Sequence, residues 1–225
     1  MRRVLVLRPE PGAAATAARA TALRLEAVVA PLFVASAVPW QAEGAEAFDA
    51  LMLTSANAVR LGGEQLARYR RLPVFAVGEA TAAAARGAGF TDVRAGESDA
   101  VALLDMVAAA GHRRVLHFAG REHRDVKHPA LHLTRTIVYA VDPVAALSDV
   151  ARSALADGAV ALLHSPRAAA HFATLVGNGS AVRIAAISAA AASAAGEGWA
   201  AVAVAYHPDD AALLAAAARL CDQAD

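Results

Sequence analysis

The fold is decided by the segment Leu53-Thr54-Ser55-Ala56-Asn57-Ala58-Val59. It follows the apolar run Ala50-Leu51-Met52-Leu53 and leads into a stretch rich in helix-forming residues. A short apolar strand without alternation, followed at once by a helix, is typical of a parallel sheet that is covered on both faces. The segment therefore predicts an α/β protein with polar side chains where this strand meets its helix.

The same alternation recurs along all 225 residues. Further apolar runs predict buried strands at 4–7, 74–77, 115–118, 160–163, 184–187 and 202–205. Between them, stretches rich in helix formers predict helices at 13–23, 56–69, 81–88, 99–110, 167–176 and 209–220. A repeated order of strand and helix predicts open parallel α/β sheets.

The opening segment has a second copy 110 residues further along the chain. Leu163-His164-Ser165-Pro166-Arg167-Ala168 aligns with residues 53–58, and the same offset aligns Val77-Gly78 with Ile187-Ser188. Alanine-rich α/β sequence can resemble itself anywhere, but these matches fall in order at strand ends. We therefore infer a duplicated unit of about 110 residues, forming two similar flavodoxin-like lobes with a ligand cleft between them.

Two segments interrupt the helical pattern at equivalent places in the two halves. Pro31 to Trp40 and Thr134 to Pro143 carry β-branched or aromatic residues and are punctuated by prolines. We expect two antiparallel linker strands there, at about 32–40 and 134–142, so that the chain crosses between the lobes twice. Lobe 1 is then discontinuous, with residues 1–35 plus 143–225, and lobe 2 comprises residues 36–142 including the linker strands.

Composition limits the partners and the compartment. Lysine plus arginine (21) balances aspartate plus glutamate (21), so no long-range field gathers nucleic acid or an anionic membrane, and a polyanion must be held by local donors. Cys221 is the only cysteine, which excludes an intrachain disulfide and fits a reducing compartment. The most apolar region, 184–196, falls short of the roughly 20 residues of a membrane span. We expect a cytoplasmic protein that binds neither nucleic acid nor membrane.

Candidate binding groups gather at the strand ends, because ligands of open α/β sheets bind beyond the carboxyl ends of the strands. Thr54, Ser55 and Asn57 offer hydroxyls, an amide and the free N–H groups of a helix start, which suit an anion. Gly78 permits a close approach of the backbone, and Thr81 lies in the next helical turn. Simple helix capping and a tight turn are the structural alternatives.

The second half and the first strand supply equivalent groups. Ser165 and Ser188 are the second-half counterparts, and Arg8 ends the first strand. Gly120 and Arg121 end the duplicate of that strand. Guanidinium groups at these ends hold carboxylates by paired hydrogen bonds, whereas a solvated surface arginine is the alternative.

Other patterns predict no site. Gly196-Glu197-Gly198 lies between a helix and a strand, the reverse of a dinucleotide-binding motif, so a nucleotide-dependent enzyme is the weakest alternative. The histidines between His112 and His132 match no zinc spacing. His164-Ser165 has no evident partner acid. We expect no metal and no cofactor.

Taken together, the motifs resemble the uroporphyrinogen-III synthase family over essentially the whole chain. The matching elements, in order, are Arg8-Pro9, residues 53–59, residues 77–82 leading to Gly89-Phe90, Gly120-Arg121, Val138-Tyr139, Ser165-Pro166, and Pro208 before the last helix. Each is weak alone, and their order and spacing carry the resemblance.

The resemblance implies a function. Enzymes of this family convert linear hydroxymethylbilane to uroporphyrinogen III in haem biosynthesis, with loss of water and inversion of ring D, and without a cofactor. Their substrate carries eight carboxylates, which implies a binding role for Arg8, Thr54, Ser55, Asn57, Gly78, Thr81, Gly120, Arg121, Ser165 and Ser188. The family tyrosine falls on Tyr139, which by analogy helps the hydroxyl to leave.

The sequence also departs from the family pattern. The turn that begins Ile187-Ser188-Ala189 lacks the family's threonine, and Asp209 replaces another threonine after Pro208. A non-catalytic two-lobed protein that binds a polycarboxylate or tetrapyrrole is therefore the alternative function. We expect a monomer that makes at most a transient contact with the preceding pathway enzyme.

Overall fold

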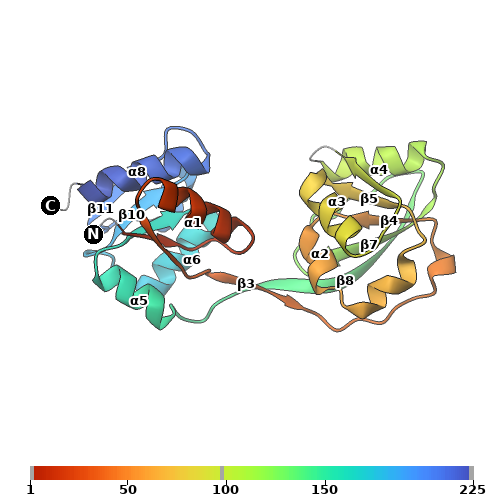
Figure 1. The fold of residues 1–225 in the computed structure, drawn as a ribbon, viewed down its shortest axis with the longest axis horizontal. Coiled ribbons are helices and arrows are strands. Elements are labelled where there is room, and N and C mark those ends of the chain that lie inside the picture. Colours follow the sequence, from red (N-terminus) through yellow and green to blue (C-terminus); the bar gives the residue numbers. More distant parts are fainter. Residues whose placement is uncertain (1–2, 97–98, 223–225) are drawn as a thin grey trace. The chain divides into compact units, whose positions relative to one another are not determined.

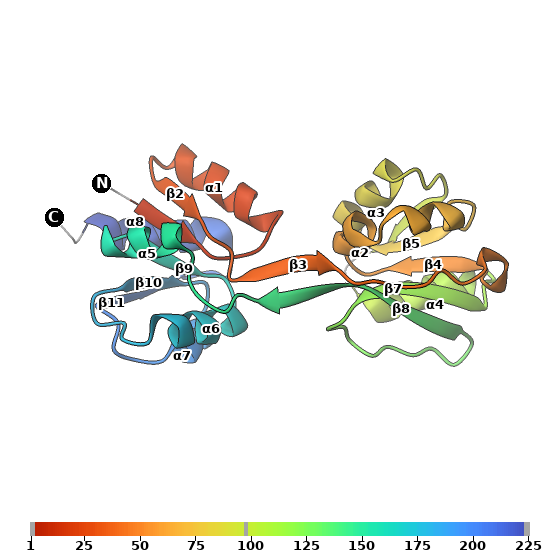
Figure 2. The ribbon, with the colours of Figure 1, turned by 90° about the horizontal axis from the view of Figure 1, so that it is seen from below.

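The computed structural model describes residues 3–96 and 99–222, and it contains two sheets (Figure 1). The chain divides into two compact units, of which unit 1 comprises residues 1–34 and 143–225 and unit 2 comprises residues 35–142. Each unit holds one sheet, and its strands pair in parallel except for the outermost pair at one edge of the unit 2 sheet (Figure 2). The predicted α/β fold with parallel sheets is confirmed.

Unit 1 contains a five-stranded sheet of order β11-β10-β9-β1-β2. Its strands are β1 (Arg3–Val6), β2 (Glu26–Val29), β9 (Val160–Leu163), β10 (Arg183–Ala186) and β11 (Ala201–Val204). Its helices are α1 (Gly12–Ala22), α5 (Asp149–Ala156), α6 (Pro166–Val176), α7 (Ala189–Ala195) and α8 (Asp210–Asp222). Helices α1 and α8 share one apolar core with the Val4 and Val6 side of β1, and α5, α6 and α7 pack on the other face.

Unit 2 contains a six-stranded sheet of order β3-β8-β7-β4-β5-β6. Its strands are β3 (Phe33–Ala37), β4 (Ala50–Leu53), β5 (Val74–Val77), β6 (Val93–Gly96), β7 (Arg114–Gly120) and β8 (His132–Pro143). Its helical segments are η1 (Ala45–Ala47), α2 (Ala56–Leu61), η2 (Glu64–Tyr69), α3 (Gly78–Gly87) and α4 (Ala100–Ala109). One core joins α2, η2 and α3 to the Leu51 and Leu53 side of β4, and a second joins α4 to the Met52 side.

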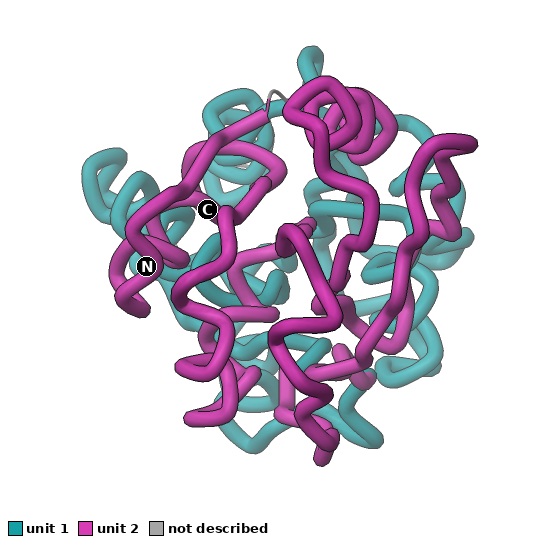
Figure 3. Tube along the Cα trace, turned by 90° about the vertical axis from the view of Figure 1, so that its right-hand side faces the viewer, with its two compact units in different colours: residues 1–34, 143–225 teal, residues 35–142 magenta. Residues whose placement is uncertain are grey.

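The chain passes between the units along β3 and β8, which are hydrogen-bonded neighbours. The N–H of Val38 donates to the carbonyl of Val138 at 3.0 Å, and the arrows of the two strands point in opposite directions in Figure 2. The two passages make unit 1 discontinuous in sequence, as the colours of Figure 3 show.

The two sheets have the same plan. Read from one edge, β11-β10-β9-β1-β2 corresponds strand for strand to β6-β5-β4-β7-β8, so β4 and β9, which carry the two copies of the opening motif, are the central strands of their sheets. The helix predicted over 56–69 is divided into α2 and η2, because Gly63 takes a φ of +75°. None of the described helices combines the length and apolar character that crossing a bilayer requires.

Candidate functional site

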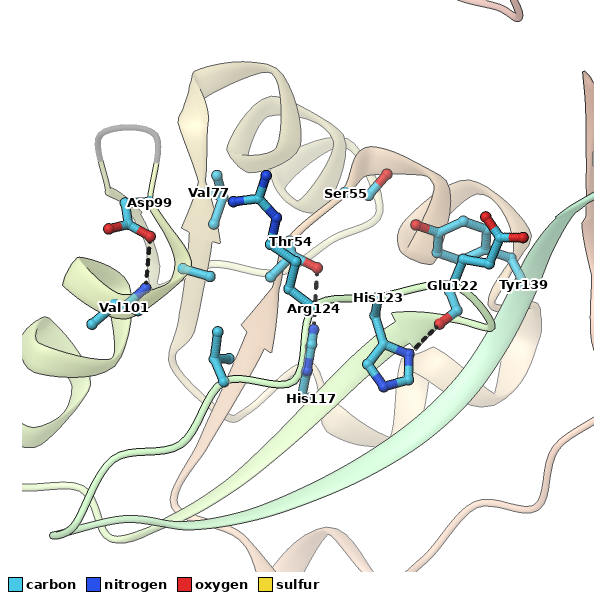
Figure 4. A pocket seen from close by; sticks show the side chains of 13 residues that line it. Thr54, Ser55, Val77, Asp99, Val101, His117, Glu122, His123, Arg124 and Tyr139 are labelled. Atoms are coloured by element: carbon cyan, nitrogen blue, oxygen red, sulfur yellow. Dashed lines mark hydrogen bonds between the residues drawn. The ribbon is translucent and has the colours of Figure 1, made fainter. Parts of the chain in front are cut away.

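A cavity of about 440 Å³ lies at the carboxyl end of the unit 2 sheet (Figure 4). Strands β4, β5, β7 and β8, the start of α4 and the loop after β7 contribute to its wall. The lining residues are Thr54, Ser55, Val77, Asp99, Ala100, Val101, His117, Gly120, Glu122, His123, Arg124, Val126 and Tyr139. The cavity therefore lies where open α/β sheets bind their ligands.

Thr54 and His117 meet inside this cavity. Met52 and His117 are register partners on β4 and β7, so the next residue on the same side of β4 is Thr54. The Thr54 Oγ1 lies 3.1 Å from the Nε2 of His117, a residue only 1% exposed. Burial, and then the nearby charges of Arg135 and His123, lower the pKa of His117 to about 4. The imidazole is consequently neutral at pH 7.

Tyr139 is directed into the cavity by an irregularity in the pairing of β7 with β8. Ala119 pairs with Ile137, but Gly120 pairs with Tyr139, so β8 carries one extra residue. A bulge of this kind re-aims the side chain that follows it. Gly120 is required there, because a Cβ at this position would lie 2.6 Å from the Cζ of Tyr139 and 2.9 Å from its hydroxyl.

The turn after β7 is held to the same tyrosine. The N–H of Arg121 donates to the Tyr139 carbonyl at 2.9 Å, and the Nδ1 of His123 donates to the Gly120 carbonyl at 2.8 Å. The Arg121 side chain is exposed and bonds Asp142 at 2.9 Å, and it is not among the lining residues. Of the predicted unit 2 residues, the cavity thus brings together Thr54, Ser55, Gly120 and Tyr139.

Other predicted residues of unit 2 have structural roles in the helices that follow the strands. Ser55 lines the cavity and also caps α2, since its Oγ accepts a hydrogen bond from the Asn57 N–H at 3.2 Å. Gly78 begins α3 with a φ of +73°, and Thr81 is buried on the same helix. Asn57, Gly78 and Thr81 are not lining residues. Sequence spacing placed them near the strand ends, but it did not show which side chains face the cavity.

In unit 1 the predicted residues bond within the protein. Ser165 caps α6 by accepting from the Ala168 N–H at 3.1 Å, and Ser188 caps α7 in the same way from the Ala191 N–H at 3.2 Å. The Arg8 guanidinium lies 3.7 Å from Asp210.

Asp210, in the first turn of α8, is the centre of a polar cluster. It accepts hydrogen bonds from His164 Nε2 (3.0 Å), Thr16 Oγ1 (2.9 Å) and Arg19 (2.8 Å). Burial raises the pKa of Asp210, but the hydrogen bonds from these three residues outweigh it and lower the pKa overall. Burial also lowers the pKa of His164, so an ionised carboxylate holds a neutral imidazole. The interpretation that His164 has no partner acid was wrong, because the acid lies 46 residues further along the chain.

Among the residues that sequence reasoning missed are His117, Asp210, and the lining residues His123 and Arg124. The signal for His117 was a polar residue inside the apolar run Val115-Leu116-His117-Phe118. Asp210 had no such signal, since an acidic residue in the first turn of a helix is ordinary. Within 3–96 and 99–222, no three His, Cys, Asp or Glu side chains gather in a way that would hold a metal ion.

A family model described as uroporphyrinogen-III synthase HemD matches residues 14–215. This chain belongs to that family. Its structure is similar to that of uroporphyrinogen-III synthetase from Helicobacter pylori 26695, at 17% identity over 98% of this chain and 100% of the other, with a TM-score of 0.60. Thermus thermophilus uroporphyrinogen III synthase is matched at 15% identity over 98% and 99% of the two chains, with a TM-score of 0.42. No curated protein is matched in sequence.

The side chains that line the cavity can donate hydrogen bonds and exchange protons, and Asp99 and Glu122 add two carboxylates to the lining. Thr54 and Tyr139 place two hydroxyls in it, and His117 and His123 add imidazoles. Arg124 contributes a positive charge to the same wall. Donors of this kind bind carboxylates and stabilise a leaving oxygen.

Proposed function

We propose that this chain is a uroporphyrinogen-III synthase that closes linear hydroxymethylbilane to uroporphyrinogen III. The observation that carries the proposal is the family match over residues 14–215. The TM-score of 0.60 supports the same fold as the Helicobacter pylori protein.

The reaction needs an ordered loss and gain of bonds. The C–O bond of the terminal hydroxymethyl group breaks, and the hydroxyl leaves as water after it gains a proton. The substituted α-carbon of ring D bonds to the freed methylene and gives a spiro intermediate, and the original bond from that carbon to the methylene next to ring C then breaks. That methylene bonds to the other α-carbon of ring D, which loses a proton as the macrocycle closes with ring D inverted. Water is thus the only other product, and no oxidant or reductant is consumed.

The chain's own residues supply binding and one proton donor in this proposal. Tyr139 donates a hydrogen bond or a proton to the departing hydroxyl, and its ring is fixed against Gly120. Thr54, Ser55 and Arg124 hold carboxylates of the bilane at the cavity wall. Fixing the carboxylates folds the linear substrate so that its ends meet, and such proximity supplies several kcal/mol.

The finer features of this function are also proposals. We expect no cofactor, a monomer in the cytoplasm, and at most a transient contact with the enzyme that delivers the bilane. A ligand cleft between two lobes joined by a linker stays a prediction. So does substrate binding by the following residues: Arg8, Asn57, Gly78, Thr81, Arg121, Ser165 and Ser188.

The decisive experiment is an isomer assay. The protein is incubated with hydroxymethylbilane generated enzymatically, and the oxidised products are separated by chromatography. We expect the type III isomer. Recovery of only the type I isomer, which forms spontaneously, would contradict the proposal, and tight product binding without closure would favour a non-catalytic binding protein.

A further inference from the structure

One nitrogen of the His117 imidazole, the ring that bonds Thr54, lacks a hydrogen-bond partner among the described residues. The Nδ1 of His117 is buried and has no hydrogen-bond partner among the described residues, while its Nε2 bonds Thr54. A neutral imidazole has one N–H donor and one lone-pair acceptor, so the direction of the Thr54 bond depends on which nitrogen carries the proton.

Arg135 decides between the two tautomers. It is the register partner of His117 on the neighbouring strand β8, and its buried Nε also lacks a partner among the residues that the structure describes. An arginine Nε is always a donor and its group is always positive. No hydrogen bond joins these two unpartnered atoms, so Arg135 acts on the imidazole through its charge. Strand β8 flanks β7 on the side opposite β4, and a positive charge on that side favours a lone pair on the ring nitrogen that does not bond Thr54. The geometry therefore puts the proton of His117 on Nε2.

The direction of the bond to Thr54 follows. With its proton on Nε2, His117 donates to the Thr54 Oγ1, and the single hydroxyl proton of Thr54 is left for another acceptor. Thr54 lines the cavity, as Figure 4 shows, so that acceptor belongs to a bound ligand. In the opposite tautomer the Thr54 hydroxyl would donate its hydrogen bond to His117 and would present only lone pairs to the cavity, which repel an anion.

We propose that His117 is a positioning residue, which holds the hydroxyl of Thr54 as a hydrogen-bond donor to a carboxylate oxygen of the substrate. The identity of that carboxylate as one of the bilane's rests on the proposed function. The charged and titratable groups that act on the His117 imidazole are Arg135 on β8 and His123 in the loop after β7. Both oppose a positive charge on His117, so the donor direction persists across neutral pH.

The tautomer is measured directly by nitrogen-15 NMR of the histidine ring in the ligand-free protein. The expected spectrum shows His117 protonated on Nε2 alone, without change between pH 5.5 and pH 8. A proton on Nδ1, or a titration within this range, would overturn the proposal. This measurement does not depend on catalysis.

The second test uses the steady-state kinetics of four variants. His117→Phe and Thr54→Val each remove the donor, and we expect KM to rise about tenfold with kcat changed less than twofold, since a hydrogen bond to a charged group is lost. The double variant should be no worse than either single variant, because His117 acts only through Thr54. His117→Gln retains an N–H near the position of Nε2 and should recover most of the lost affinity.

The outcomes separate this proposal from the proposed function. An inactive wild type with the expected tautomer would remove the synthase activity and leave the hydroxyl direction standing. An active wild type whose His117→Phe variant keeps its KM would remove the role of His117 alone. Additive losses in the double variant, or no recovery in His117→Gln when circular dichroism shows a folded protein, would also overturn it.

Discussion

Strands β4 and β9 are followed by copies of the same sequence motif, but the polar side chains at their ends make different contacts. Thr54 at the end of β4 aligns with His164 at the end of β9. In unit 1, His164 bonds Asp210, which also holds Thr16 and Arg19. In unit 2, Thr54 bonds a neutral histidine and lines a cavity of about 440 Å³.

The difference shows how one duplicated plan can serve two purposes. The unit 1 cluster pairs an ionised carboxylate with several donors, and these bonds stabilise the packing of α1 and α8 on the sheet. The buried Nδ1 of His164 has no hydrogen-bond partner among the described residues. The polar atoms of unit 2 retain capacity for a ligand. We therefore expect substitutions of residues at the unit 2 cavity to affect kcat or KM, and those in the unit 1 cluster to affect stability.

The largest expected effect is that of Tyr139→Phe. Loss of the hydroxyl should lower kcat by at least about a hundredfold, because general acid assistance to the leaving group is worth that much. Stability should change little, since the ring still fits against Gly120. The measurement is initial rate of type III formation beside thermal unfolding.

A matched control for this variant is Tyr69→Phe in the same unit. The Tyr69 hydroxyl donates to the Glu43 carbonyl at 2.8 Å and does not line the cavity. This variant should lose about 1 kcal/mol of stability and keep its turnover. Unchanged turnover in Tyr139→Phe, or equal losses in both variants, would remove the role assigned to Tyr139.

The next largest effect is expected for Asp210→Asn, which tests whether the polar cluster around Asp210 stabilises unit 1. Asparagine keeps the shape but removes the negative charge from a side chain that is 13% exposed and faces Arg8, Arg19 and His164. We expect a loss of about 2 kcal/mol in the free energy of unfolding, measured by urea denaturation. The neighbouring Asp209→Asn is the control, because asparagine caps α8 as well as aspartate does. A loss no larger than that of the control would mean that the cluster does not stabilise unit 1.

Most of the fold could be predicted from the sequence because its strands are buried on both faces. A strand such as Val160–Leu163 must then be a continuous apolar run, which a single sequence displays directly. The short edge strands β2 and β6 were not predicted, because residues such as Glu26 and Arg94 lie in exposed positions and break the apolar pattern. The division of the 56–69 segment depended on the backbone angle of Gly63, which composition does not reveal.

The candidate site could be predicted only as far as the strand ends. Position along the chain identified Thr54, Ser55 and Gly120, since each follows or ends a buried strand. It could not identify the partner of His164, because Asp210 reaches it only through the packing of α8 on the sheet. The extra residue in β8 that directs Tyr139 is likewise a property of strand pairing and not of either strand alone.

The smallest expected effect is on the pH dependence of stability. His117 has a pKa of about 4 in the folded protein against 6.5 when exposed, so between these values the unfolded chain binds more protons. Stability from this neutral histidine is then present above pH 6.5 and is lost as the pH falls towards 4. Between pH 7 and pH 5 the loss is about 1.8 kcal/mol.

His117→Phe removes this titration, so its unfolding free energy should fall less than that of the wild type between pH 7 and pH 5. Thr54→Val is the control, because it loses the same hydrogen bond but keeps the imidazole and hence the pH dependence. Burial also lowers the pKa of His164, so this residue should contribute to the pH dependence of stability that remains in His117→Phe. Asp210→Asn should alter the contribution of His164, because Asp210 bonds its imidazole. If His117→Phe and Thr54→Val followed the same pH curve, the neutral buried histidine of unit 2 would not be the group that titrates, and the contrast between the two strand ends would rest on geometry alone.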